Sequence, residues 1–306
     1  MTLDHPRPGG VYLPLVTPFL DGEVDHASVK QLLARYRDSG IAGIVLLGTT
    51  GESPVLDADE AERIVELVAS CVQGSLPLYL GVSGNDTRHV AASVRRSGRL
   101  PVDGYLVTAP YYNRPSQSGL IAHFDAVVSE TDRDVIVYNI PYRTGVNLHN
   151  DSLFTLADRH PHIVGVKDSS GDIKQSLELL REGSDRLAVL TGEDHLFFAS
   201  VALGGAGGIL AAAHIEPESF VRVFDELRGG NAAAALEHWN ALSSWIPLLF
   251  GEPNPAPLKV WLADQGLVQS PECRLPLSAV SEQLVTELRH RLPQEKDSLR
   301  GDRSGS

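Results

Sequence analysis

A lysine at the end of a short apolar run is the residue in this chain best suited to covalent chemistry. Residues 163–166 read Ile-Val-Gly-Val and lead directly into Lys167, and a Ser-, Gly- and Asp-rich turn follows at 168–172. Such a run predicts a buried parallel strand, with Lys167 at its carboxyl end. Burial disfavours the ammonium form and lowers the pKa of a lysine, and a neutral amine can attack a ketone to form a Schiff base. A lysine at a strand end can also simply extend its amine into solvent.

Polar side chains follow other predicted strands at the same point. The sequence GTTGES, residues 48–53, combines glycines that free the backbone N–H groups with the hydroxyls of Thr49 and Thr50, which suits an anion. Tyr138 ends the fifth predicted strand and is a candidate proton carrier, and Arg143 offers a fork for a carboxylate. Each feature also has a plain structural reading: a tight turn, a buried phenol or a surface ion pair. Together they suggest Schiff-base chemistry on a small keto acid.

These side chains need a framework that brings strand ends together. Apolar runs that alternate with amphipathic stretches predict eight strand–helix units in about 220 residues, which indicates a closed (β/α)₈ TIM barrel of the α/β class. The expected strands are 10–19, 42–48, 76–82, 104–109, 135–140, 163–167, 187–191 and 205–210. The expected helices are 25–39, 57–72, 87–96, 117–129, 151–159, 172–182, 194–203 and 216–227. All strand ends would then meet at one rim of the barrel.

The strand–helix alternation stops near residue 228. Residues 232–250, 255–264 and 277–291 each predict a helix, and the last stretch is polar and rich in Gly and Ser. We therefore expect a catalytic barrel at 1–228, a helical extension at 229–292 and a disordered tail at 293–306.

Composition limits the partners that this chain can have. Its 306 residues carry a formal net charge of −13, which argues against binding to nucleic acid or to anionic membranes. Cys71 and Cys273 are far apart and form no CxxC pair, so neither a zinc site nor a disulfide framework is expected. No metal-type cluster, phosphate-binding glycine motif, signal peptide or membrane span is apparent. We expect a cytoplasmic enzyme without metal or other cofactor, acting on small molecules.

Five motifs, in order and spacing, carry a resemblance to a known family. They are GTTGES from Gly48, PYYNRPSQSGL from Pro110, YNIPYRTG from Tyr138, GVKDSSGD from Gly165 and PNPAPLK from Pro253. The chain to about Arg291 resembles the dihydrodipicolinate synthase / N-acetylneuraminate lyase family of class I pyruvate aldolases. The resemblance implies a (β/α)₈ barrel with a helical C-terminal extension, in agreement with the strand count.

The resemblance also implies the catalytic roles. Lys167 would form the imine with the C2 carbonyl of pyruvate, and Tyr138 matches the tyrosine that moves protons at that carbon. Thr49 matches the threonine that links this tyrosine to a second one, which Tyr112 matches. In family members the neighbouring subunit donates that second tyrosine. A dimer is therefore implied, and we expect a homotetramer.

Four further positions match substrate-binding residues. Thr50 matches the residue whose backbone holds the pyruvate carboxylate, and Arg143 matches the arginine that binds the carboxylate of the aldehyde partner. Gly192 and Ile209 match positions that line the pyruvate pocket. The GTTGES motif and the two tyrosines favour condensation of pyruvate with L-aspartate 4-semialdehyde to 4-hydroxy-tetrahydrodipicolinate, on the route to diaminopimelate and lysine.

Three departures from the usual family pattern leave alternatives open. They are Tyr142 beside Arg143, the residues after Lys167, and the Ala-Ala-Ala-His run at 211–214. Paralogous 2-keto-acid aldolases and sugar-acid dehydratases share some of them. A catalytically idle keto-acid-binding protein is an alternative of another class, although such a protein has no need of a proton relay.

Regulation by lysine is a separate expectation. Lysine-inhibited relatives place an acid and histidines at an interface site, where this chain has His89, Ala58 and Ala61, with Asn85 and Tyr111 retained. A lysine ammonium without an anionic partner would be desolvated and unpaired. We expect insensitivity to lysine, unless another acid such as Glu52 replaces the missing one.

Overall fold

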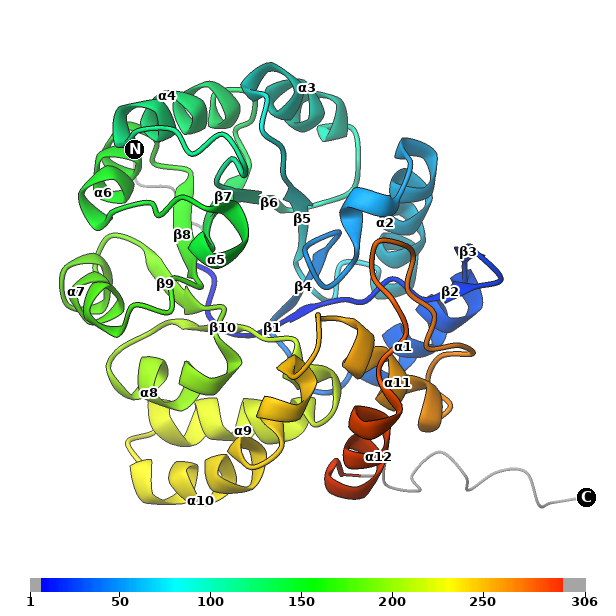
Figure 1. Ribbon diagram of the computed structural model, residues 1–306. Helices are drawn as coiled ribbons and strands as arrows, with labels where there is room; N and C mark the ends of the chain where they lie inside the picture. The colour runs from blue at the N-terminus through cyan, green and yellow to red at the C-terminus, as the bar shows by residue number, and fades with distance from the viewer. Residues whose placement is uncertain (1–6, 294–306) are drawn as a thin grey trace, which may run out of the picture.

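The computed structural model describes residues 7–293, and its centre is a closed barrel of eight parallel strands (Figure 1). The order around the barrel is β1-β10-β9-β8-β7-β6-β5-β4, so chain neighbours lie side by side and β1 closes the ring against β4 and β10. The barrel strands are β1 (Gly10–Pro14), β4 (Gly43–Leu46), β5 (Leu78–Val82), β6 (Gly104–Thr108), β7 (Asp134–Asn139), β8 (Ile163–Asp168), β9 (Ala188–Thr191) and β10 (Gly207–Ile209). The predicted (β/α)₈ TIM barrel is confirmed.

Helices surround the barrel on its outer side (Figure 1). The helices between strands are α1 (His26–Tyr36), η1 (Ser53–Val55), α2 (Ala58–Val72), α3 (Thr87–Ser97), α4 (Gln117–Val128), α5 (Pro141–Thr144), α6 (Asn150–Arg159), α7 (Ile173–Gly183), η2 (Asp194–Leu196) and α8 (Phe197–Ala202), and the 3₁₀ turn η3 (Ala212–His214) follows the last strand. Acidic or hydroxyl caps begin several of them, and the Asp57–Glu60 capping box of α2 is an example. Most predicted bounds lie within a few residues of these.

Two apolar layers hold the barrel together. Strand side chains that face outward pack under the helices, while nine inward-facing residues fill the barrel itself. The inner cluster consists of Tyr12, Val45, Tyr79, Leu106, Ile136, Tyr138, Ile140, Leu190 and Ile209. The centre of the barrel is therefore packed, and ligands can reach only its rim.

The first predicted strand was too long. It ends at Pro14 rather than Phe19, and the following residues form a small antiparallel hairpin of β2 (Phe19–Leu20) and β3 (Glu23–Val24). Pro18 has no N–H to donate to a ladder, which favours the break between the strand and the hairpin.

The helical extension is present, with two corrected boundaries. It follows α9 (Pro217–Arg228) and consists of α10 (Ala232–Ser243), η4 (Ile246–Phe250), α11 (Ala256–Asp264) and α12 (Glu282–Arg291). The single helix expected at 232–250 is wrong because Pro247 cannot continue an α-helix, so a 3₁₀ turn takes over. The helix expected at 277–291 begins only at Glu282, where the Ser281 side chain caps it.

Within the extension, α10 packs against α9 while α11 lies beside α1, and the loop between α11 and α12 reaches the segment just before α2 (Figure 1). Arg274 in that loop makes a bidentate ion pair with Glu60 of α2, at 2.5 and 2.7 Å. The proposed division at residue 228 stays a prediction, and the predicted tail at 293–306 lies, apart from Pro293, outside the described residues. Among residues 7–293, no helix is long and apolar enough to cross a membrane.

Candidate active site

Lys167 lies near the carboxyl end of β8, opposite Tyr138 of β7 in the parallel register. Its side chain is 7% exposed, and its Nζ lies 4.3 Å from the centroid of the Tyr138 ring. Burial lowers the pKa of Lys167 to about 8, and Arg143 lowers it further, while Asp194 and Glu193 oppose the shift. An amine in this environment supplies the neutral form near neutral pH, as nucleophilic attack on a ketone requires.

The ring of Tyr138 lies beside that amine. Burial raises the pKa of its phenol to about 12, although the neighbouring Ser169 and Thr49 hydroxyls act in the opposite direction. The phenol therefore stays protonated at neutral pH, ready to donate a proton to an atom bound at Lys167.

The GTTGES loop, residues 48–53, follows β4 at the same rim. Thr50 is buried, and its Oγ1 accepts a hydrogen bond of 3.0 Å from Asn254 Nδ2. Within residues 7–293, the backbone N–H groups of Thr49 and Thr50 donate no hydrogen bond. Two adjacent unpaired N–H groups are the arrangement that a carboxylate needs.

A buried ion pair between Glu52 and Lys259 holds this loop in place. Glu52 has a left-handed backbone conformation, with φ of 53°, and its carboxylate accepts from Lys259 Nζ of α11 and from the Arg274 backbone N–H. Lys259 is fully buried, donates also to the Glu272 carbonyl at 2.8 Å, and lies over the Phe19 ring. The PNPAPLK motif thus supports the loop that carries Thr49 and Thr50.

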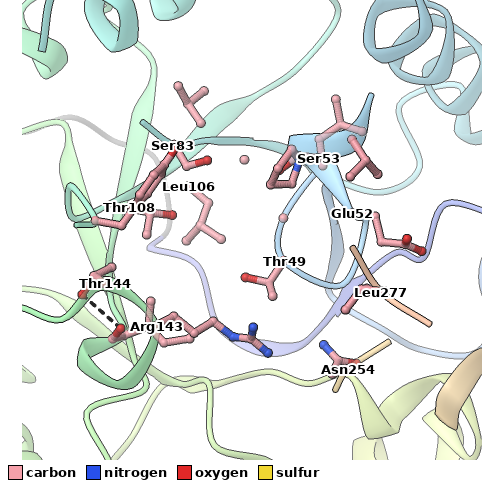
Figure 2. A pocket seen from close by; sticks show the side chains of 18 of the residues that line it. Thr49, Glu52, Ser53, Ser83, Leu106, Thr108, Arg143, Thr144, Asn254 and Leu277 are labelled. Carbon is pink, nitrogen blue, oxygen red and sulfur yellow. Dashed lines mark hydrogen bonds between the residues drawn. The ribbon is translucent and has the colours of Figure 1, made fainter. Parts of the chain in front are cut away.

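Arg143 of α5 lies between two hollows at the barrel mouth. In Figure 2 its side chain extends across the first hollow toward Thr49 and Asn254. This cavity holds about 280 Å³, and a second of about 430 Å³ is lined by Tyr142, Glu193 and other residues. Arg143 makes no ion pair among the described residues, so its guanidinium is available to a substrate carboxylate.

Gly192 and Ile209 complete the floor of the site. A side chain on Gly192 would collide with the Lys167 methylenes and the Ser169 hydroxyl, so this position must be glycine. Ile209 is buried in the inner cluster with Tyr138. The structure therefore brings seven of the eight predicted site residues to one rim: Lys167, Tyr138, Thr49, Thr50, Arg143, Gly192 and Ile209.

Tyr112 is the exception. Its side chain is 84% exposed, and its neighbour Tyr111 lines the first cavity instead. Its φ of 73° is unusual for a bulky residue, and its N–H donates to the Thr144 carbonyl at 3.1 Å. The backbone thus holds the Tyr112 ring away from the site of its own chain.

Three polar residues at the rim were not predicted from the sequence. Ser169 follows Lys167 by two residues, and Glu193 and Asp194 come after β9. Burial raises the pKa of Asp194 to about 7, and burial also raises the pKa of Glu193. The acidic pair directly after a predicted strand was the signal that could have identified them.

Comparisons with known proteins agree with this geometry. The model of the Dihydrodipicolinate synthetase family matches residues 7–295. The chain is 43% identical over 279 residues to 4-hydroxy-tetrahydrodipicolinate synthase 2 of Clostridium acetobutylicum, which covers 91% of this chain and 97% of that protein.

Solved structures give the same result. The dihydrodipicolinate synthase from Aquifex aeolicus superposes with a TM-score of 0.89 at 33% identity, over 94% of this chain and 100% of that one. The enzyme from Cyanidioschyzon merolae, with lysine bound, gives a TM-score of 0.88 at 33% identity, over 93% and 97% of the two chains. On sequence, fold and family match together, this chain belongs to the dihydrodipicolinate synthetase family.

Proposed function

We propose that this protein is a Schiff-base pyruvate lyase that condenses pyruvate with L-aspartate 4-semialdehyde to 4-hydroxy-tetrahydrodipicolinate. The observation that carries the proposal is the buried Lys167 amine, 4.3 Å from the centre of the Tyr138 ring, at a rim that also presents Arg143. Relatives named 4-hydroxy-tetrahydrodipicolinate synthase support the choice of substrates.

The chemistry follows from the positions of these groups. Lys167 Nζ attacks C2 of pyruvate, and the resulting carbinolamine loses its hydroxyl as water when Tyr138 donates a proton. Loss of a proton from C3 gives an enamine, whose C3 attacks the aldehyde carbon. The amino group of the semialdehyde then attacks C2, which closes the ring and releases Lys167. The imine itself is the electron sink, so the proposed reaction needs no metal or other cofactor.

The GTTGES loop and Arg143 would orient the substrates. The N–H groups of Thr49 and Thr50 would bind the pyruvate carboxylate, and Arg143 would bind the carboxylate of the semialdehyde on the outer side. The Tyr142 ring lies 5.6 Å from the Arg143 guanidinium and narrows this entrance, which favours a short aldehyde over a long sugar acid. The alternatives, a paralogous aldolase or dehydratase and an idle binding protein, are not favoured.

The exposed Tyr112 supports an oligomer as the active form. A ring held outside its own site in a left-handed backbone conformation is suited to enter the site of a neighbouring copy. We propose a homotetramer, acting in the cytoplasm, in which Tyr112 serves the adjacent subunit. Mixing Tyr112→Phe subunits with Lys167→Ala subunits should restore part of the activity, since one site in each mixed pair has both groups intact. If no mixture regains turnover, each site is built within one chain.

A substrate screen tests the reaction itself. Purified protein should consume pyruvate only when aspartate 4-semialdehyde is present, and it should leave sugar-acid substrates unchanged. Turnover of a sugar acid at a higher kcat/KM than the pair of proposed substrates would assign the chain to a paralogous activity.

A further inference from the structure

The side-chain hydroxyl of Ser169 is buried and forms no hydrogen bond within the part of the chain that the structure describes. Side chains alternate along an extended segment, so Ser169 lies on the same side as Lys167 while Asp168 between them faces α7 and accepts from Ser176. The Ser169 backbone N–H continues the ladder by donating to the Asn139 carbonyl at 2.9 Å. Its side chain has 0% exposure, yet among residues 7–293 its Oγ has no hydrogen-bond partner.

Three functional groups surround this hydroxyl. Gly192 allows the Ser169 side chain and the Lys167 methylenes to share the space above its Cα. The Ser169 hydroxyl approaches the Tyr138 phenol and the Glu193 carboxylate, and it lowers the pKa of both, although neither approach is a formed hydrogen bond in this state. Glu193 is half-buried and lines the 430 Å³ cavity, so it connects this cluster with solvent.

A serine with a purely structural role would not keep a buried hydroxyl without a hydrogen-bond partner. Burying a hydroxyl without a partner costs free energy, and an alanine of nearly the same shape avoids that cost. The neighbouring Ser170 shows the contrast, because its Oγ contacts Ser176 at 3.4 Å and accepts from the Asp172 N–H at 3.3 Å. The unpaired Ser169 hydroxyl therefore points to a partner that arrives with the reaction.

We propose that Ser169 links Tyr138 to Glu193 and that the three form a proton path within one chain. The inference rests on the proposed function, because the path serves the adduct at Lys167. When the carbinolamine loses water, the C2–O bond breaks and Tyr138 gives its proton to the departing oxygen. Ser169 then passes its proton to Tyr138 and takes one from Glu193, and Glu193 is reprotonated from the cavity. This path does not depend on the Tyr112 of a neighbouring subunit.

Rapid mixing with pyruvate, followed by borohydride quenching, measures how fast the Lys167 adduct forms. Ser169→Ala and Glu193→Gln should each slow adduct formation about tenfold, less than loss of a sole proton donor because other routes remain. The double variant should be no slower than the slower single variant, since both changes break one path. Ser170→Ala is the matched control and should form the adduct at the parent rate.

The pH profile separates a proton path from a positional effect. Lys167, Asp168, Asp194 and Arg143 are the charged groups around Glu193. In the parent, the rate of adduct formation should drop where the Glu193 carboxyl loses its proton, and both Glu193→Gln and Ser169→Ala should remove this inflection. The second inflection, where the rate rises as the Lys167 amine loses its proton, should remain in both variants. The unfolding temperature of Ser169→Ala should equal or exceed that of the parent, because no protein hydrogen bond is lost and an unpaired buried hydroxyl is removed.

Several results would overturn the inference. These are an unchanged adduct rate in both single variants, multiplicative effects in the double variant, or an acid-side inflection that persists. A lower unfolding temperature in Ser169→Ala would indicate a structural hydroxyl, and Glu193→Gln, at a half-exposed position, would then carry the test alone. If the parent protein forms no adduct at all, it is the proposed function that fails, so the two failures are distinguishable.

Discussion

Replacing Lys259 by methionine should destabilise the whole protein, because it leaves a buried carboxylate without its cation. Lys259 is fully buried, and its Nζ bonds the Glu52 carboxylate and the Glu272 carbonyl. Burial lowers the pKa of Lys259, while Glu52 opposes that shift and keeps the ammonium form in place. Methionine matches the length of the stem and removes only the charge and its donors.

The size of the effect follows from the environment of Glu52. Its side chain is 2% exposed, and without Lys259 the carboxylate would keep, within residues 7–293, only the 3.1 Å hydrogen bond from the Arg274 N–H. Removing one partner of a buried ion pair costs about 3–5 kcal/mol. For a domain of this size that is a fall in Tm on the order of 10 °C. Because Glu52 belongs to the GTTGES loop, the KM for pyruvate should also rise.

Differential scanning calorimetry at one protein concentration measures this loss. Lys259→Met with Glu52→Gln should recover at least half of the lost stability, because no buried charge is then unpaired. Arg289→Met is the matched control: it breaks the exposed pair with Asp264 and should leave Tm almost unchanged. A Lys259→Met protein with the Tm and KM of the parent would refute the claim that this ion pair supports the loop.

Three further predictions concern the site. With the pKa of Lys167 lowered to about 8, the rate of adduct formation should rise roughly tenfold between pH 7 and 9 and then level off, as the amine loses its proton; a rate that keeps rising beyond pH 10 would mean an ordinary lysine. Tyr138→Phe keeps the ring but removes the hydroxyl, and should lower kcat by roughly 10²–10⁴-fold with the Tm unchanged; a kcat within threefold would exclude the phenol as proton donor. L-Lysine should not inhibit, because Glu52 is already bound by Lys259 and cannot replace the missing acid; half-inhibition below about 1 mM at saturating pyruvate would contradict this.

The fold could be predicted because its signals are local. Each barrel strand is a short apolar run between turn residues, and each helix between strands has an apolar face, so the strand–helix alternation was readable without tertiary information. The errors came where local signals conflict. Residues 15–19 are mostly apolar but include Thr17 and Pro18, and residues 246–250 are apolar but contain Pro247. In both places the proline ended an element that the apolar pattern alone would extend.

The site was predictable to the extent that its residues follow strands. Lys167, Tyr138 and Thr49 end or follow β8, β7 and β4, so the topology alone puts them at one rim. Glu52 with Lys259 was not predictable as a pair, because the partners are 207 residues apart in the chain and meet only through the fold of the extension. The role of Ser169 was equally hidden, since an unpaired hydroxyl is recognisable only once its neighbours are placed.

The central claim is that Lys167 carries the substrate as an imine. Incubation with pyruvate and borohydride, followed by peptide mass spectrometry, tests it most directly. We expect one reduced three-carbon adduct per chain, located on Lys167, and no turnover in Lys167→Ala. An adduct on another lysine, or full activity in protein that traps no pyruvate, would contradict the account.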